Sequence, residues 1–199
     1  MADTRAGYSL AFARNVISAK MGPYAAALPP IYVKFSGHYV ALGGPGRGVE
    51  RLSGDWGDLS LMLGQFPDYE SVAGFWWSPE YRAAAALRVG AVDVDCCRLA
   101  GRPIPDAHEA VLVLVFRPAD AATLQALDSC CRAAVHGSLL APLDPAAFEV
   151  LEGDFTGCSV RVLSFPDRAA LDADWAAIGA VLAGRGALQA YAAARHHPA

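Results

Sequence analysis

A repeat within the chain sets the strongest limit on its fold. Residues 50–68 (ERLSGDWGDLSLMLGQFPD) align without a gap to residues 149–167 (EVLEGDFTGCSVRVLSFPD), which lie 99 positions later in a chain of 199 residues. Identical or similar residues fall at the same places in both copies: Glu50 and Glu149, Gly54 and Gly153, Asp55 and Asp154, Trp56 and Phe155, and Phe66-Pro67-Asp68 and Phe165-Pro166-Asp167. A repeat at about half the chain length indicates a tandem duplication of one small domain.

The composition is that of a globular protein. Apolar side chains make up 54% of the chain and charged ones 18%, so the chain can bury a sizeable core. The formal net charge is −4, and the arginines are scattered rather than gathered into a basic block. Nucleic acid is therefore not expected as a partner, which leaves small molecules and protein surfaces.

We expect neither a membrane segment nor an export signal. No apolar run reaches the roughly 18 residues of a membrane span. The start, MADTRAGYSLAFARN, lacks a cationic segment followed by a long apolar one. The sequence therefore predicts a cytoplasmic protein without a membrane partner.

Five cysteines occur as Cys96-Cys97, Cys130-Cys131 and Cys158, without a C-x-x-C pair or a histidine at zinc-finger spacing. A metal site is therefore not expected, and the thiols are interpreted as small buried apolar residues in a reducing compartment. No flavin, haem or nicotinamide motif is present, so no bound cofactor is expected either.

The first copy, assigned to residues 1–100, predicts the order strand, helix, strand, strand, helix, strand. Strands are expected at 8–17, at 38–44 with an extension through 50–55, at 59–66 and at 92–99, and helices at 18–36 and 69–91. Proline removes an amide donor and clashes with the preceding turn, so the first helix should kink or break at Pro29-Pro30. Asp68 should cap the second helix, and Pro79 should begin a renewed turn after Ser78.

The second copy, assigned to residues 109–199 after a linker at 101–108, predicts a diverged version of the same order. Strands are expected at 109–117, at 138–141 continuing through 148–154, and at 159–165. Helices are expected at 120–136 and, because the segment is rich in alanine, over the whole of 167–195. No fourth strand is evident, so a helical C-terminus is predicted.

Motifs in residues 8–99 resemble one protein family. G-H-Y-V-A-L-G-G, E-R-L-S-G-D-W, Q-F-P-D and F-W-W-S-P-E-Y-R follow one another in the order and spacing of the thirteen-thirty domain-of-unknown-function family, within the dimeric α/β-barrel superfamily. The second copy keeps E-x-L-E-G-D-F and S-F-P-D but lacks the S-P-E-Y signature. The match is therefore specific to the first copy.

The resemblance implies an α+β fold of two ferredoxin-like units. In this superfamily such a unit pairs sheet to sheet with a second protomer, and here the second copy can supply that partner within one chain. The expected architecture is therefore an intramolecular dimeric α/β barrel with antiparallel sheets packed face to face. A monomer with an internal pseudo-dimer is expected, with further dimerisation left open.

The resemblance also sets an expectation for function, although the family has no general activity to carry over. The superfamily includes cofactor-free monooxygenases, cyclases, isomerases and lyases that act on small aromatic or polyketide-like molecules, and also non-catalytic binding modules. We therefore expect a cofactor-independent enzyme that uses acid/base and electrostatic catalysis. The alternative is a non-catalytic small-molecule-binding or structural pseudo-dimer.

In such a unit the cavity lies between the sheet and its own two helices. The candidates for catalysis in the first copy are His38, Tyr81 and Arg88, because imidazole and phenol groups transfer protons and a guanidinium holds an anionic oxygen. Aromatic walls with a few polar tips suit a planar organic ligand. The candidates for substrate binding are Tyr24, Glu50, Asp55, Trp76 and Trp77.

Each candidate also has a structural interpretation. Trp76 has a counterpart in Trp175 and is expected to belong to the core, and Arg88 could pair with Glu50 or Asp55 to stabilise the fold. His38 begins a strand and could be solvated. Because Glu50 and Asp55 recur in the second copy, they suggest a structural turn, and a single site should lie where the copies differ. The first copy is expected to hold it.

Overall fold

The computed structural model describes residues 5–54, 59–144 and 147–197, which form an α+β fold. The elements of the first half are β1 (Ala6–Arg14), the short 3-10 helix η1 (Ser18–Lys20), α1 (Gly22–Lys34), β2 (His38–Pro45), β3 (Gly48–Ser53), β4 (Ser60–Phe66), α2 (Tyr69–Trp77), α3 (Pro79–Ala86) and β5 (Asp93–Gly101). Those of the second half are β6 (Ala110–Pro118), α4 (Ala121–Arg132), β7 (Ser138–Ala141), β8 (Phe148–Glu152), β9 (Ser159–Phe165), α5 (Arg168–Leu182) and β10 (Gly186–Ala194).

The strands form one curled mixed sheet in the order β7-β9-β6-β10-β3-β2-β4-β1-β5-β8. Each half lends one strand to the other, since β3 pairs with β10 and β8 pairs with β5. A short parallel pairing of β2 with β3 joins the two sets. The two separate antiparallel sheets expected from the sequence are thus joined into one. The exchange covers strand edges that each half would otherwise expose to solvent.

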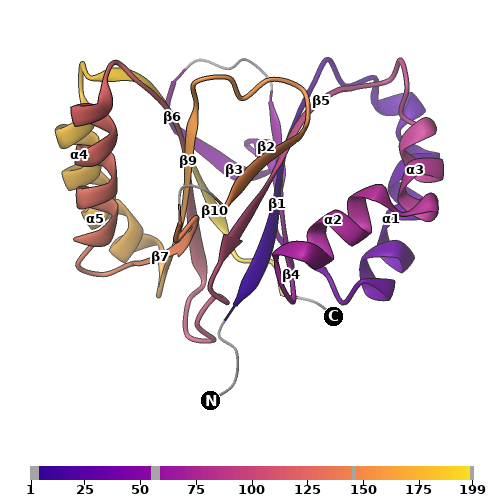
Figure 1. Ribbon diagram of the computed structural model, residues 1–199, viewed down its shortest axis with the longest axis horizontal. Coiled ribbons are helices and arrows are strands. Elements are labelled where there is room, and N and C mark those ends of the chain that lie inside the picture. Colours follow the sequence, from indigo (N-terminus) through magenta and orange to yellow (C-terminus); the bar gives the residue numbers. More distant parts are fainter. Residues whose placement is uncertain (1–4, 55–58, 145–146, 198–199) are drawn as a thin grey trace.

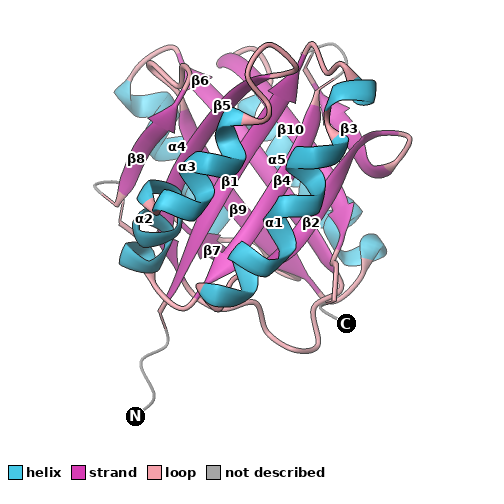
Figure 2. Cartoon of the chain, turned by 90° about the vertical axis from the view of Figure 1, so that its right-hand side faces the viewer, coloured by secondary structure: helices cyan, strands magenta, loops and turns pink. Residues whose placement is uncertain are grey.

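Apolar side chains form three cores, one between the strands of the two halves and one beneath the helices of each half. Figure 1 shows the strands in the middle, with α4 and α5 on one side and α1, α2 and α3 on the other. The central core contains Tyr8, Leu10 and Phe12 of β1 together with Val113 of β6 and Tyr191 of β10. In Figure 2, α1, α2 and α3 lie across the outer face of the first-half strands. Over the described ranges, no helix is both long enough and apolar enough to cross a membrane.

The repeated segment plays the same structural role in both halves. Asp68 begins α2 and accepts a hydrogen bond from the Ser71 backbone N–H (2.7 Å), as Asp167 does for Ala170 at the start of α5 (2.8 Å). Phe66 pairs with Gly7 of β1, and Phe165 pairs with Ala110 of β6. The cap predicted at Asp68 is confirmed, Asp167 forms the equivalent cap in the second half, and the register of the two copies agrees with the ungapped alignment.

The first helix contradicts the predicted break at its prolines, because α1 runs without interruption through Pro29 and Pro30. Proline removes the donors that would bond the carbonyls of Ala25 and Ala26, and both alanines are exposed, so water can satisfy those carbonyls. Leu28, Ile31 and Tyr32 bury the inner face on both sides of the prolines. The predicted interruption at Ser78-Pro79 is confirmed, since α2 ends there and α3 begins.

The predicted helical C-terminus is wrong. The helix ends at Leu182, and residues Gly186–Ala194 form β10, an inner strand between β6 and β3. Gly184 has a positive φ of 72°, which favours glycine and stops the helix. Ala190 and Ala192 face the helices while Tyr191 and Ala193 face the central core, so burial on both faces overrides the helical preference of alanine.

Two glycines should not tolerate alanine. A Cβ on Gly37 would lie 2.5 Å from the Phe66 ring, and one on Gly137 would lie 2.3 Å from the Phe165 ring. Both rings are buried and have no room to move, so Gly37→Ala and Gly137→Ala should each lower the free energy of unfolding by about 1–3 kcal/mol in urea denaturation. Gly22→Ala is the control, because nothing lies within 4 Å of its Cβ. A loss at only one of the two positions would show that the copies do not share this contact.

Candidate functional site

The two halves differ in the sheet surface that faces their own helices. Strand register equates Ala11 with Leu114 and Ala13 with Phe116, because their partners on β4 and β9 are 99 positions apart. Small side chains therefore leave space above the first-half sheet, whereas large ones fill the same space in the second half.

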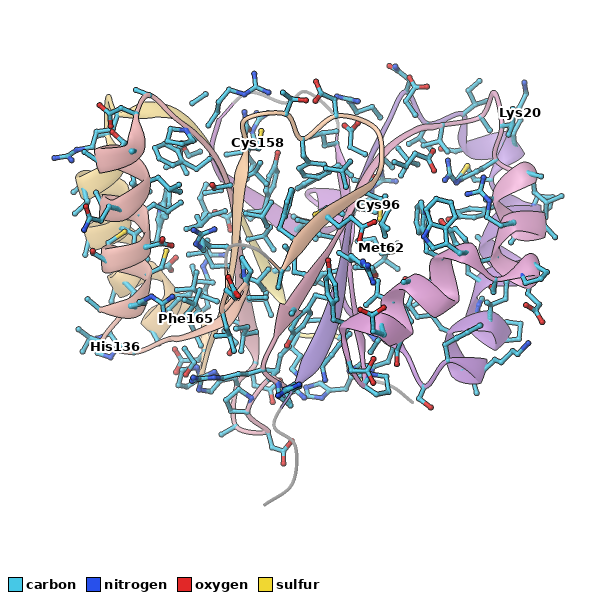
Figure 3. The ribbon with its side chains drawn as sticks, viewed as in Figure 1. Lys20, Met62, Cys96, His136, Cys158 and Phe165 are labelled. Atoms are coloured by element: carbon cyan, nitrogen blue, oxygen red, sulfur yellow. The ribbon has the colours of Figure 1, made fainter. Side chains whose placement is uncertain are left out.

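A second difference lies at Met62, whose counterpart is Arg161. Arg161 is buried, and its Nε donates to Asp128 of α4 at 2.8 Å. This ion pair occupies the second half where the first half has only the flexible thioether of Met62. Figure 3 shows Met62 and Cys96 between the first-half strands and their helices, and Phe165 on the corresponding side of the second half.

The space in the first half is a cavity of about 480 Å³ between the sheet and the helices α1 and α3. Its lining is largely apolar, and the exposed side chains of Val16 and Leu42 belong to it. The lining residues are Ala11, Ala13, Val16, Ser18, Met21, Tyr24, Ala25, Leu28, Pro29, Tyr39, Leu42, Ser60, Leu61, Met62, Tyr81, Val92 and Val94. A cavity of this size and character suits a small organic molecule.

Three phenols give the cavity its main polar character: Tyr24 of α1, Tyr39 of β2 and Tyr81 of α3. The break between α2 and α3 positions Tyr81. Ser78 donates from Oγ to the Phe75 carbonyl (2.8 Å) and accepts from the Tyr81 backbone N–H (3.1 Å), which fixes the first turn of α3. The S-P-E-Y signature is therefore a helix start that directs a tyrosine into the cavity. In the second half α5 continues through this region without a break.

The phenols are protonated donors at neutral pH. Burial raises the pKa of Tyr81, and the adjacent Tyr24 raises it further. Burial also raises the pKa of Tyr24, an effect that its hydrogen bond with Tyr81 and the charge of Arg88 oppose. Burial, with a smaller contribution from Tyr24, raises the pKa of Tyr39 to about 12. Tyr24 and Tyr81 thus lie next to each other on the cavity wall.

Arg88 lies behind this pair. Its guanidinium carbon is 5.8 Å from the centre of the Tyr24 ring, within the range of a cation–π contact. Its Nη1 and Nη2 donate to the two carboxylate oxygens of Glu152 at 2.9 and 2.7 Å. Glu50 is not this partner, contrary to one alternative drawn from the sequence, because it pairs with Arg168 instead. The reason is the strand exchange, which carries Glu50 on β3 to β10 and brings Glu152 on β8 to β5.

The two tryptophans lie outside the cavity lining. Trp76 is 1% exposed and packs against Tyr81 with ring centres 4.6 Å apart, so it belongs to the core beneath the helices. Trp77 points outward and is 57% exposed, with the Arg82 guanidinium 5.6 Å from its ring centre. Trp76 therefore packs against the Tyr81 ring without lining the cavity.

His38, Glu50 and Asp55 are not brought into the cavity either. His38 begins β2 and precedes Tyr39, so its side chain leaves the opposite face of the strand. Burial, followed by the charges of Arg195 and His196, lowers its pKa. Glu50 is exposed and accepts from Arg168 at 2.6 Å. Asp55 lies outside the described residues.

Sequence reasoning missed Tyr39, Met62 and Glu152. The alignment of the two copies gave a partial signal, because the residue types differ at both positions: Met62 aligns with Arg161, and Glu152 aligns with Ser53. The repeat could not reveal that Glu152 crosses to the first half, since that depends on the exchanged strand β8.

Two of the depressions elsewhere on the molecule are larger than this cavity. One, of about 660 Å³, runs along β3 and β10 and contains Glu50 and Arg168, which already pair with each other. The other, of about 510 Å³, lies between α4 and α5 and is mainly apolar. The five cysteines are free thiols, and the described part of the chain contains no group of three His, Cys, Asp or Glu side chains that could hold a metal ion.

Comparison with solved structures finds the same fold at low sequence identity. An anthrone oxidase-like protein shares 12% identity with a TM-score of 0.53, over 98% of this chain and 93% of that one. A protein from Fusobacterium nucleatum described as a putative monooxygenase shares 8% identity with a TM-score of 0.55, over 95% of this chain and 91% of that one. No curated protein matches the sequence.

Comparison with family models gives one match in the first half. Residues 6–101 match the model described as "Domain of unknown function (DUF1330)", and this range contains all the residues that line the cavity. The structural neighbours are of the dimeric α/β-barrel type, as the motifs in the sequence implied. Residues 6–101 of the chain therefore match the DUF1330 family model, on a fold of the dimeric α/β-barrel type.

Proposed function

We propose that the first-half cavity binds a small, planar, largely apolar molecule of aromatic or polyketide-like type. The observation that carries this proposal is the cavity of about 480 Å³, whose apolar walls bring the phenols of Tyr24 and Tyr81 together. An oxygen of the ligand would accept hydrogen bonds from these phenols, while the apolar floor at Ala11 and Ala13 would contact its rings.

The proposed activity is that of a cofactor-independent enzyme. A phenol that stays protonated at neutral pH donates a hydrogen bond to an oxygen on which negative charge develops, as in an enolate. Tyr81 and Tyr24 would supply this stabilisation, with Arg88 acting on Tyr24 from behind. Cyclase, isomerase, lyase and monooxygenase reactions that begin with deprotonation next to a carbonyl group pass through such charge. The two structural neighbours, described as an anthrone oxidase-like protein and a putative monooxygenase, have names that belong to this range of chemistry.

A non-catalytic binding protein is the second candidate. It is favoured by one observation: within the described residues, the cavity lining contains no carboxylate, imidazole or amine group that could act as a base near neutral pH. A molecule that co-purifies with the protein and is identified by native mass spectrometry separates the two functions. Incubation with fresh protein should convert it if the protein is an enzyme and leave it unchanged if the protein only binds it.

We further propose that the two halves are ferredoxin-like units that pair as the two chains of a dimeric α/β barrel do. The shared central core and the exchange of β3 and β8 support this arrangement. Because the second half then replaces a partner chain, sedimentation velocity should show a monomer at micromolar concentration. A tight dimer at the lowest detectable concentration would contradict the proposal.

Filling the cavity floor should weaken binding. Ala11→Leu gives the first half the residue that the second half has at the equivalent position, Leu114. The affinity for the neutral fluorescent probe N-phenyl-1-naphthylamine should fall by about tenfold or more, because the added side chain occupies the site of its rings. Fluorescence titration measures this loss.

Ala83→Leu is the control for this experiment, because Ala83 is exposed on α3 and should leave the affinity unchanged. Ala13→Leu provides a second filled variant. Probe binding that survives both filled variants, each shown to be folded by circular dichroism, would place the binding site elsewhere.

Removing one phenol should lower the affinity only for ligands that carry a hydrogen-bond-accepting oxygen. Tyr81→Phe and Tyr24→Phe should each reduce the affinity for 2-acetylnaphthalene by about tenfold, since a positioned hydrogen bond is lost. The affinity for N-phenyl-1-naphthylamine should change little, because this probe has no carbonyl. Competition between the two compounds gives both affinities. Equal losses for both would mean that the phenols contribute shape rather than hydrogen bonds.

A further inference from the structure

The ion pair between Arg88 and Glu152 joins the halves next to the cavity. Arg88 follows α3 and is 5% exposed, while Glu152 ends β8 in the second half. Both carboxylate oxygens accept from the guanidinium, a bidentate arrangement that is among the stronger hydrogen-bonded ion pairs in proteins. The second half thereby contributes a residue to the surroundings of a cavity that it does not line.

The charge of Arg88 acts on a cavity that is otherwise neutral. Among the described residues, the lining contains alanines, other apolar side chains, serines and phenols, but no Asp, Glu, Lys, Arg or His. The guanidinium lies against the outer side of the Tyr24 ring, and its buried Nε has no partner among the described residues. Without Glu152, an unpaired cation would therefore stand one side chain away from the ligand, and it would favour anions.

We propose that Glu152 is a specificity-determining residue of the first-half cavity. By neutralising Arg88 it restricts the cavity to uncharged ligands that carry an accepting oxygen, such as aromatic ketones and quinones, and disfavours carboxylates. This inference rests on the proposed function, because it concerns which ligand the same cavity accepts. The second half would then contribute to ligand selection, because the pairing of β8 with β5 holds the Glu152 carboxylate in place.

A second ion pair on the same two strands provides a matched control. Arg98 of β5 donates from Nε to Glu149 of β8 at 2.7 Å, and the guanidinium also stacks on Tyr69 at 3.9 Å. Neither Arg98 nor Glu149 lines the cavity. Glu149→Gln removes a carboxylate from the same strand without changing the charge next to Tyr24.

The experiment compares two probes with the same rings, the neutral 2-acetylnaphthalene and the anionic 2-naphthoate. The wild-type protein should bind the ketone more tightly than the carboxylate. Glu152→Gln should shift the ratio of the two affinities toward the carboxylate by about tenfold or more, because the positive charge of Arg88 beside Tyr24 is then no longer neutralised and attracts an anion in the poorly solvated cavity. Glu149→Gln should leave the ratio unchanged. In the double variant Glu152→Gln with Arg88→Met, the ratio of the two affinities should return to the wild-type value.

The outcomes separate this inference from the proposed function. If the wild-type protein binds the ketone but Glu152→Gln does not alter the ratio, the role of Glu152 is overturned and the function stands. The same holds if the wild-type protein binds the carboxylate at least as tightly as the ketone. If the wild-type protein binds neither probe, both the function and this inference are overturned. Circular dichroism and ketone binding by each variant confirm that it is folded.

Discussion

The pairing of each half with a strand of the other is the interaction on which the rest of the structure depends. β3 lies against β10 and β8 lies against β5, so neither half completes its sheet alone. Backbone hydrogen bonds must be satisfied wherever a strand is buried, and the exchange satisfies them while it brings the two inner faces together around one core. The helices then pack on the outer faces of the sheet. The cavity forms in the first half, where the side chains between the helices and the sheet do not fill the space.

The duplication explains how a cavity can form without loss of the fold. The central core needs large apolar side chains from both halves, and both supply them. The outer cores are separate, so one can be filled while the other is hollowed. In the second half Phe116 and the pair of Arg161 with Asp128 fill the space, whereas Ala13 and Met62 leave it open in the first. Stability and ligand binding are thus divided between two copies of one unit.

The sequence predicted features that depend on local chemistry. The aspartate caps, the helix break at Ser78 and the register of the repeat all follow from residues close together in the chain. It also located the cavity in the first half and placed Tyr24 and Tyr81 in its wall. Features that depend on distant partners were missed. Alanine-rich β10 forms a strand only because β6 and β3 flank it, and the partner of Arg88 arrives on a strand from the other half.

The position of β10 also affects the order in which the chain can fold during its synthesis. Residues Gly186–Ala194 leave the ribosome long after β3, the strand with which they pair. Until they emerge, β3 lacks the strand that covers its edge, and the centre of the sheet has a gap between β6 and β3. Such long-range pairing slows folding and leaves an open strand edge in the nascent chain. The sheet of the first half is therefore made early but stays incomplete until β10 has been made.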